Sequence, residues 1–184
     1  MEKFDGLDFK VFDEKDVKIF TPIMKRAYDE DSKMHRNGEE GGPQGYDNGD
    51  CLRSSFMDKT SSSFSVYKDD TPVGAINLFI NDHFEGWLQV IFIDYDYWSQ
   101  GIGQIIWNYV EQKYTQVKVW RLQTPGYSRR NHNFYVNKCG FKIIHIIEPN
   151  KKNRPYPGFY LFEKKMDEAN TDINAIFTRM RKSR

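Results

Sequence analysis

The pattern of apolar and polar positions is clearest between residues 88 and 114. Residues 88–93 form a short run of apolar and β-branched side chains, which is typical of a buried strand. Beyond Gly101 and Gly103, apolar side chains recur every three or four residues, as they do in a helix that buries one face. This helical stripe consists of Ile102, Ile105, Ile106, Tyr109 and Val110. The segment is therefore predicted to form a strand, a glycine turn and a helix, in that order.

Shorter patterns extend the prediction along the chain. Runs that alternate or are continuously apolar predict seven strands in total: 8–12, 64–68, 73–80, 88–93, 117–123, 141–147 and 159–164. The three strands within 64–93 are expected to be antiparallel neighbours that lead into the central helix. Further helices are predicted over 51–59 and 131–139, and the apolar spacing within 167–184 indicates a C-terminal helical tail. That tail is expected to dock on the domain or on another subunit, which would give a homodimer.

The first helix and the segment after it are harder to place. A helical stretch begins at Asp13 or Glu14 and contains Pro22, which removes a helical hydrogen bond. We expect a break or a kink at Pro22, or else a helix that begins at Thr21 with Pro22 in its first turn. Residues 29–50 are rich in Gly, Glu and Asp and predict a long loop. A loop of this length in a compact domain is usually functional or disordered.

Length, charge and cysteine content limit the class of protein. The 184 residues are enough for one domain with a substantial core, which we place at 1–166. With 27 basic and 26 acidic residues the net charge is +1, so nothing indicates a nucleic-acid partner. No apolar run approaches the roughly 18 residues of a membrane span, and the start of the chain has no apolar signal segment. We expect a soluble, cytoplasmic protein without a membrane partner, in which Cys51 and Cys139 are free thiols.

The glycine turn carries the first chemical indication. The first backbone N–H groups of a helix have no internal partner, and the helix dipole places its positive end there. Glycine at 101 and 103 would allow a phosphate to approach the backbone without meeting a Cβ atom. The turn lacks the Lys-Ser/Thr ending of a P-loop and the third glycine of the dinucleotide fingerprint. A Gly-X-Gly on its own fits a simple tight turn at least as well.

Two motifs in this half of the chain resemble those of a known family. Residues 93–103 (IDYDYWSQGIG) resemble the acetyl-CoA-binding motif of the GNAT superfamily of N-acyltransferases, a strand followed by Gln/Arg-X-X-Gly-X-Gly/Ala at the start of a helix. Residues 135–141 (YVNKCGF) resemble the family's Tyr-rich helix closed by Lys-X-Gly-Phe. Trp98 occupies the position where the family usually has Gln or Arg. Val136 occupies the place of the family's frequent tyrosine, and Tyr135 lies one residue earlier. The resemblance covers roughly residues 8–166.

The resemblance implies a fold and a cofactor site. The implied fold is α+β (α/β), with a mixed, mostly antiparallel central sheet of about seven strands and helices on both faces. The implied co-substrate is acetyl-CoA, with no metal. The implied cofactor-binding residues are Phe92, Ile93, Trp98, Ser99, Gln100, Gly101, Ile102, Gly103, Asn131 and Asn133. An equal alternative for Asn131 is an ordinary helix cap, and Arg129 and Arg130 are either phosphate ligands or solvated.

Acyl transfer to an amine requires a base for the amine and an acid for the leaving thiolate. Glu85 and Asp94, at the two ends of the central strand, are candidate bases, although each is also explained as a solvated carboxylate, and His83 is a third candidate. Tyr135 is the candidate acid, with core packing as its alternative. In the long loop, Tyr46 and Asp47 are candidates for contacts with the acceptor, or else solvated turn residues.

The predicted function is therefore N-acetyl transfer from acetyl-CoA to a primary amine of a small molecule or peptide. The amine would attack directly in a ternary complex, because this chemistry needs no covalent enzyme intermediate. The alternative is a non-catalytic CoA-binding or protein-interaction module of the same fold. The departures at Trp98 and Val136 are the reason to retain that alternative.

Overall fold

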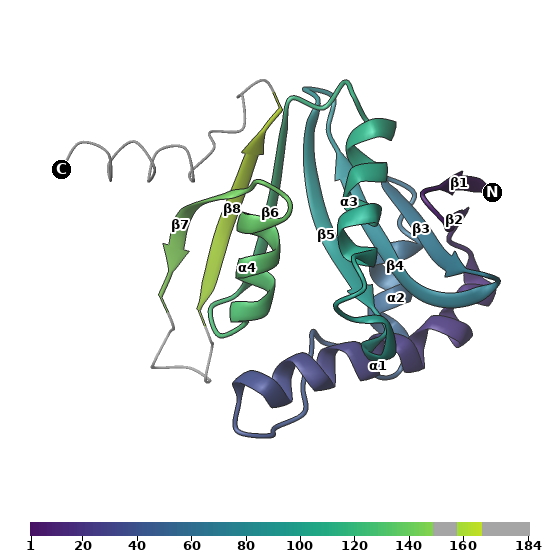
Figure 1. Ribbon diagram of the computed structural model, residues 1–184, viewed down its shortest axis with the longest axis vertical. Coiled ribbons are helices and arrows are strands. Elements are labelled where there is room, and N and C mark those ends of the chain that lie inside the picture. The colour runs from purple at the N-terminus through teal and green to yellow at the C-terminus, as the bar shows by residue number, and fades with distance from the viewer. Residues whose placement is uncertain (149–157, 167–184) are drawn as a thin grey trace.

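A single sheet organises the structure, a computed structural model that describes residues 1–148 and 158–166. Its eight strands lie in the order β1-β2-β3-β4-β5-β6-β8-β7 (Figure 1). Every neighbouring pair is antiparallel except β5 and β6, which are parallel. The strands are β1 (Glu2–Phe4), β2 (Leu7–Val11), β3 (Ser61–Lys68), β4 (Thr71–Ile80), β5 (Glu85–Ile93), β6 (Val119–Pro125), β7 (Lys142–Ile147) and β8 (Phe159–Lys165). The predicted α+β fold with a mixed, mostly antiparallel sheet is confirmed.

The strand that the sequence pattern missed is β1. It is only three residues long, too short to show an alternation, and it forms a hairpin with β2. The turn between them is Asp5-Gly6, and both residues have positive φ, 47° and 79°. Such an Asp-Gly turn is a recognised hairpin signal, so the residues that could have predicted β1 are in its turn.

Helices cover both faces of the sheet, as predicted. The helices are α1 (Glu14–His35), α2 (Asp50–Phe56), η1 (Tyr95–Tyr97), α3 (Ile102–Lys113) and α4 (Arg129–Asn137). Helices α1 and α2 pack on one face, and α3 and α4 lie on the other (Figure 1). Each face therefore has its own apolar core. The core on the α3 side contains Trp107, Trp120 and Phe141, and the core on the α1 side contains Phe20, Met24 and Leu52.

Helix α1 corrects the prediction for residues 13–50. It runs for 22 residues without interruption, so a break at Pro22 and a start at Thr21 are both wrong. A capping box starts the helix, because Asp13 accepts from the Lys15 amide and Asp16 accepts from the Asp13 amide. Pro22 is exposed, and the apolar stripe on the opposite side of the helix stays buried before and after it. Burial of that stripe outweighs the roughly 3 kcal/mol that an internal proline costs. The predicted loop consequently begins after His35 rather than at Asp29.

A bulge in β5 allows the sheet to open. Asn77 of β4 lies opposite Val90, whereas Leu78 lies opposite Leu88, so Gln89 is an extra residue in β5. Because of it, Leu88 and Ile91 both face the α3 core, although they are three residues apart. The parallel pairing of β5 with β6 ends close to this point. Only Glu85, Gly86 and Trp87 pair with β6, and beyond them the two strands diverge (Figure 1).

Gly86 is a close-packed position at the base of this divergence. A Cβ atom on Gly86 would lie 2.3 Å from the ring of Trp120, which is fully buried. Trp120 in turn packs edge-on against Trp107 of α3, with 5.4 Å between the ring centroids. The absence of a side chain at 86 therefore lets β6 bring its tryptophan across β5.

The remaining predictions on organisation concern the cysteines and the C-terminus. Cys51 and Cys139 are buried free thiols, as predicted, and burial raises the pKa of Cys139 to about 12. In the described ranges no helix has the length and apolar character needed to cross a bilayer. The predicted helical tail, 167–184, lies outside the described residues. The assignment of 1–166 to one domain stays a prediction.

We predict that Gly86→Ala destabilises the protein by about 1–3 kcal/mol, the usual cost of overpacking a core. The Trp120 ring would have to move, and its other neighbours in the core leave it little room. The free energy of unfolding from urea denaturation measures the change. Gly41→Ala is the matched control, because its Cβ would meet the flexible end of Arg36 at 3.0 Å and lie at ordinary contact distance, 3.5 Å, from Ser32 Oγ. Equal stability of the two variants would contradict the close-packed contact between Gly86 and Trp120.

Candidate functional site

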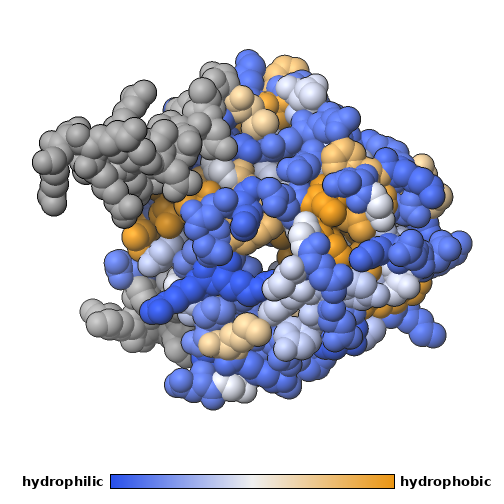
Figure 2. Space-filling view, viewed as in Figure 1, coloured by the Kyte–Doolittle hydropathy of each residue, from blue (hydrophilic) through white to orange (hydrophobic). Residues whose placement is uncertain are grey.

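A cavity of about 450 Å³ lies where β5 diverges from β6. Its walls are the end of β5, the turn before α3, the inner side of α4 and the second half of α1. The surface is hollowed near the centre of Figure 2, between the two halves of the sheet. The lining residues are Ala27, Tyr28, Asp31, Ile91, Phe92, Ile93, Tyr97, Trp98, Ser99, Gly101, Ile102, Gly103, Gln104, Arg130, Asn131, Asn133, Phe134, Tyr135 and Lys138.

The turn before α3 presents a row of unused backbone donors to this cavity. The amides of Gln104 and Ile105 both donate to the Gly101 carbonyl, at 3.0 and 3.1 Å, and these bonds close the first turn of the helix. Within the described residues, the five amides from Ser99 to Gly103 donate to no backbone carbonyl. Ser99 and Gly101 have positive φ, 62° and 82°, which turns successive N–H groups toward one side. The positive end of α3 and these amides together form a site for an anion.

The space in front of these amides is open. A Cβ atom on Gly101 would meet nothing within 4 Å. Gly103 is closer to its surroundings, because a Cβ there would lie 3.0 Å from the ring of Phe134 in α4 and 3.2 Å from Ile93. Gly101 therefore provides access for a ligand, and Gly103 provides close packing between α3 and α4.

Trp98 and Arg130 form a stacked pair beside the amides. The indole Nε1 of Trp98 donates to the Ile93 carbonyl at 2.8 Å, which fixes the ring at the end of β5. The guanidinium of Arg130 lies over that ring, 3.6 Å from its centroid. Burial lowers the pKa of Arg130, but a guanidinium keeps its charge at any physiological pH. This end of the cavity thus combines five free amides with a cation.

Tyr135 lies inside the same cavity. Its ring packs against Phe141 and Phe162, with centroid distances of 5.9 and 5.8 Å, and the residue is 6% exposed. In the described part of the chain, only Asn77 Oδ1 and Trp120 Nε1 are fully enclosed without a hydrogen-bond partner. The Tyr135 hydroxyl makes no hydrogen bond among these residues and is not one of the fully enclosed atoms, and the residue lines the cavity. Burial, with Cys139, Tyr28 and Asp31 adding to it, raises the pKa of Tyr135, and the phenol therefore keeps its proton.

Asp31 is a cavity residue that the sequence analysis did not identify. The Ser128 hydroxyl donates to its carboxylate at 2.8 Å to Oδ2 and 3.2 Å to Oδ1, although 97 residues separate the two. Ser128 is the N-cap residue of α4 but does not use its side chain to cap that helix. The helix-cap alternative for Asn131 is therefore wrong, and both Asn131 and Asn133 line the cavity. The composition of residues 29–50 predicts a loop, which hides Asp31; the signal that reveals it is the helical spacing of Met24, Ala27, Tyr28 and Asp31.

The two predicted bases lie outside the cavity. Asp94 is 5% exposed and forms an ion pair with Arg26 of α1, whose Nε lies 2.9 Å from Oδ1. Glu85 is at the opposite end of β5 from the glycine turn, where it contacts Asn81 and Arg121. These hydrogen bonds, the one from Asn81 first, lower the pKa of Glu85. Both carboxylates therefore have protein partners, and neither Asp94 nor Glu85 is among the residues that line the cavity.

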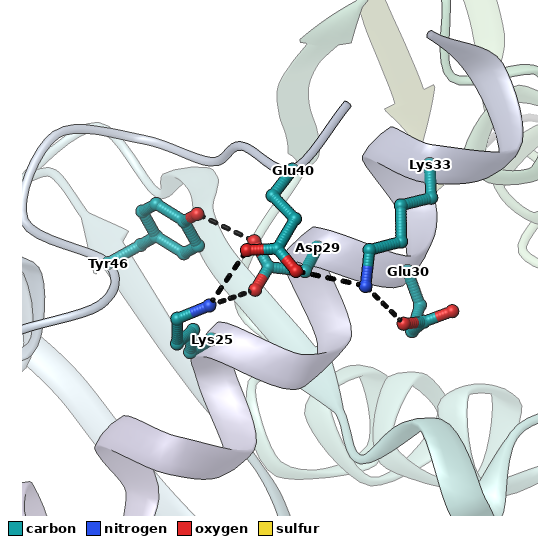
Figure 3. A network of polar contacts seen from close by, with 6 residues as sticks. All are labelled: Lys25, Asp29, Glu30, Lys33, Glu40 and Tyr46. Carbon is teal, nitrogen blue, oxygen red and sulfur yellow. Dashed lines mark hydrogen bonds and ion pairs between the residues drawn. The ribbon is translucent and has the colours of Figure 1, made fainter. Parts of the chain in front are cut away.

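Tyr46 and Asp47 do not line the cavity either. The Tyr46 hydroxyl donates to Asp29 Oδ1 at 2.6 Å, and Lys25 contacts both Asp29 and Glu40, as Figure 3 shows. Lys33 contacts Glu30 and Glu40 in the same network. Together these contacts fasten the loop after α1 onto the helix. Burial and the Asp29 hydrogen bond raise the pKa of Tyr46 to about 12.

We predict that Tyr46→Phe lowers the free energy of unfolding by about 1–2 kcal/mol at neutral pH, because it removes a hydrogen bond to a carboxylate. An unfolded tyrosine ionises near pH 10, whereas the folded Tyr46 keeps its proton to about 12. The contribution of Tyr46 is thus complete below about pH 10 and is lost as the pH rises toward about 12. Urea denaturation of both proteins across this range measures it, and a difference that does not shrink with pH would contradict the assignment.

Most of the implied cofactor residues meet in one place. The cavity brings together Phe92, Ile93, Trp98, Ser99, Gly101, Ile102, Gly103, Asn131, Asn133 and Tyr135. Gln100 is the implied cofactor residue that is not in the lining; its side chain donates to the Asp96 carbonyl at 3.2 Å. Ala27, Tyr28, Asp31, Phe134 and Lys138 were not predicted as site residues; they come from α1, from α4 and from the residue that follows α4.

The sequence was compared with known families, and the result agrees with the fold. The chain belongs to the acetyltransferase (GNAT) family, whose profile it matches over residues 24–141. It is 33% identical over 115 residues to the uncharacterized protein YrkN of Bacillus subtilis (strain 168). That alignment covers 62% of this chain and 61% of YrkN, so it spans about three fifths of the relative.

Solved structures of acetyltransferases share the fold at low sequence identity. PaiA N-acetyltransferase of Thermoplasma acidophilum, in complex with coenzyme A, has a TM-score of 0.65 at 16% identity over 86% of this chain and 98% of its own. The ribosomal-protein-S18-alanine N-acetyltransferase of Escherichia coli has a TM-score of 0.67 at 14% identity, over 91% of this chain and 98% of its own. Spermidine N-acetyltransferase of Vibrio cholerae, in complex with CoA and spermine, has a TM-score of 0.64 at 14% identity, over 87% of this chain and 95% of its own.

Proposed function

We propose that the protein transfers an acetyl group from acetyl-CoA to a primary amine of a small molecule or peptide, by direct attack in a ternary complex. The observation that carries the proposal is that one cavity contains both a row of free amides and an unpartnered tyrosine hydroxyl. Membership of the acetyltransferase (GNAT) family supports it. Structural neighbours whose names record CoA, spermine or a ribosomal-protein alanine support the same class of reaction.

Coenzyme A fits the anion end of the cavity. The amides from Ser99 to Gly103 would hold the pyrophosphate, since they have no acceptor of their own. Arg130 would supply a positive charge next to them, held in place by Trp98. Beyond Trp87, β5 lacks a β6 neighbour, so the edge that ends at Ile93 is available to the amide groups of pantetheine. When bound, acetyl-CoA supplies an activated acyl group as a thioester.

Acetyl transfer also requires proton transfers, and Tyr135 would take part in one of them. An alkylamine with a pKa near 10.4 is neutral in only about one molecule per 10³ at pH 7, so the ammonium would first give a proton to water. The neutral amine would then attack, and the new C–N bond would form as the C–S bond breaks. The nitrogen would give its second proton to water, and the leaving thiolate would take one proton. Tyr135 is proposed to donate it, which is supported by its position in the cavity lining and by a raised pKa that keeps the phenol protonated. The amide of Ile93 is proposed to donate to the oxygen that becomes negative.

The alternative is a module of this family that holds CoA and acts through protein contacts. Trp98 and Val136, which depart from the family motifs, favour it. A CoA-release assay with a panel of primary amines, together with calorimetric titration of acetyl-CoA, separates the two functions. Acetyl transfer predicts both binding and amine-dependent release, and binding without release across the panel would favour the module.

We predict that Gly101→Val weakens CoA binding by about tenfold or more, because the side chain occupies the approach to the amides. Calorimetric titration with CoA measures the affinity. Gly38→Val is the matched control: Gly38 has a φ of 87°, close to the 82° of Gly101, and also has nothing within 4 Å of a Cβ atom, but it lies outside the cavity. A folded Gly101→Val protein with CoA affinity within about twofold of the parent would contradict the phosphate assignment.

We predict that Tyr135→Phe lowers kcat by about 10²–10⁴-fold, the usual value of general acid catalysis, with little change in the KM for acetyl-CoA. The ring and its contacts with Phe141 and Phe162 would remain, so only the proton donor is lost. Tyr109→Phe is the control, since that hydroxyl donates to Glu2 at 3.0 Å, outside the cavity. A kcat for Tyr135→Phe within about threefold of the parent would assign Tyr135 to packing.

A further inference from the structure

We propose that Asp31 binds the acceptor as an ammonium ion, which makes cationic primary alkylamines the substrate class of this cavity. The inference rests on the proposed function and goes further, because it assigns the acceptor end of the site to named residues. Asp31 is the carboxylate in the described lining, where the other charged side chains, Arg130 and Lys138, are basic. Acidic and basic side chains therefore share one cavity.

Asp31 differs from the acidic residues around it in having no lysine or arginine partner. Asp29 pairs with Lys25, Glu30 pairs with Lys33, and Asp94 pairs with Arg26. In the described part of the chain, the basic nitrogen nearest the Asp31 carboxylate is His35 Nδ1, at 3.8 Å. That nitrogen lies 2.7 Å from the Asp31 backbone carbonyl, so its hydrogen is directed there. Among the described residues, Asp31 thus forms no ion pair with a lysine or arginine, and Arg130 interacts with its charge only through space.

The carboxylate is also too enclosed to be explained as a solvated surface group. Its side chain is 13% exposed, and the space next to it is the cavity. Removing a carboxylate from water is unfavourable unless hydrogen bonds or an opposite charge compensate. Ser128 supplies a neutral hydrogen bond and holds the Asp31 carboxylate in one orientation. It supplies no opposite charge, so a ligand can still offset part of the cost of removing the carboxylate from water. A cation in the cavity would supply the missing charge.

The neighbouring side chains fit an alkylammonium better than other acceptors. Tyr28 and Tyr135 line the cavity beside Asp31, and their rings can receive a cation through cation–π contact. The Tyr28 hydroxyl makes no hydrogen bond among the described residues and is a further acceptor for an N–H group. Ala27 and Ile91 add apolar surface for a carbon chain. An acceptor with a carboxylate next to its amine would bring a second negative charge toward Asp31 and be disfavoured.

The test uses the full chain saturated with CoA, and n-butylamine as the probe at neutral pH. Amide chemical-shift titration gives the affinity for n-butylammonium, and CoA release from acetyl-CoA gives kcat and KM for the same amine. Asp31→Asn keeps the shape of the side chain and an oxygen that can accept from Ser128. Glu30→Gln is the matched control: it removes the same charge from the adjacent residue, which faces Lys33 and does not line the cavity.

The expected result is that Asp31→Asn weakens n-butylammonium binding and raises the KM for n-butylamine by about tenfold or more. The n-butylammonium affinity of Glu30→Gln and the CoA affinity of both variants should stay within about twofold of the parent. The same substitution should abolish the preference of the enzyme for n-butylamine over aniline, whose amino group is uncharged at that pH. Binding unchanged in Asp31→Asn, or no binding of n-butylammonium to the parent protein, would overturn the proposal. Asp31-dependent binding without CoA release would support the ammonium site and contradict acetyl transfer instead.

Discussion

The divergence of β5 from β6 is the constraint on which the rest of the structure depends. The two strands pair over only three residues, and the Gln89 bulge and the contact of Gly86 with Trp120 lie at the base of the opening. Past this point the edge of β5 has no strand neighbour, and buried backbone groups without partners are costly. The core on the α3 side contains side chains from both halves of the sheet, including Leu88 of β5, Trp120 of β6 and Phe162 of β8, and so holds the halves together across the opening. The opening creates the cavity and leaves its backbone donors free.

The opening also explains how residues distant in sequence form one site. The turn at 99–103 enters the cavity from the end of β5, α4 contributes Tyr135 and Arg130, and α1 contributes Asp31. The bond between Ser128 and Asp31 joins α1 to α4 across the opening. The result is a cavity whose lining combines backbone amides, a guanidinium, a carboxylate and phenols. Such a combination suits a reaction that joins an anionic cofactor to a cationic acceptor.

The sequence predicted the parts of this site that depend on local patterns. The strand, glycine turn and helix at 88–113 follow from periodicity and from the conformational freedom of glycine, so the amide row was predictable. The position of Tyr135 depended on where α4 begins, which is Arg129 rather than Asn131. Asp31 was hidden because Pro22 and the polar composition of 29–50 obscured a helix that tertiary packing stabilises. The partner of Asp94, Arg26, lies 68 residues away, so no local pattern could have shown that this carboxylate was already engaged.

The backbone amides in the opening between β5 and β6 are proposed to bind the cofactor. Amide chemical shifts recorded during titration with CoA are the decisive measurement, because they report on the backbone groups themselves. We expect saturable shifts at Ser99–Gly103 and Ile93, with the loop at 36–49 unaffected. Saturable CoA binding that leaves the amides of 99–103 unchanged, or that shifts only residues outside the cavity, would contradict this assignment.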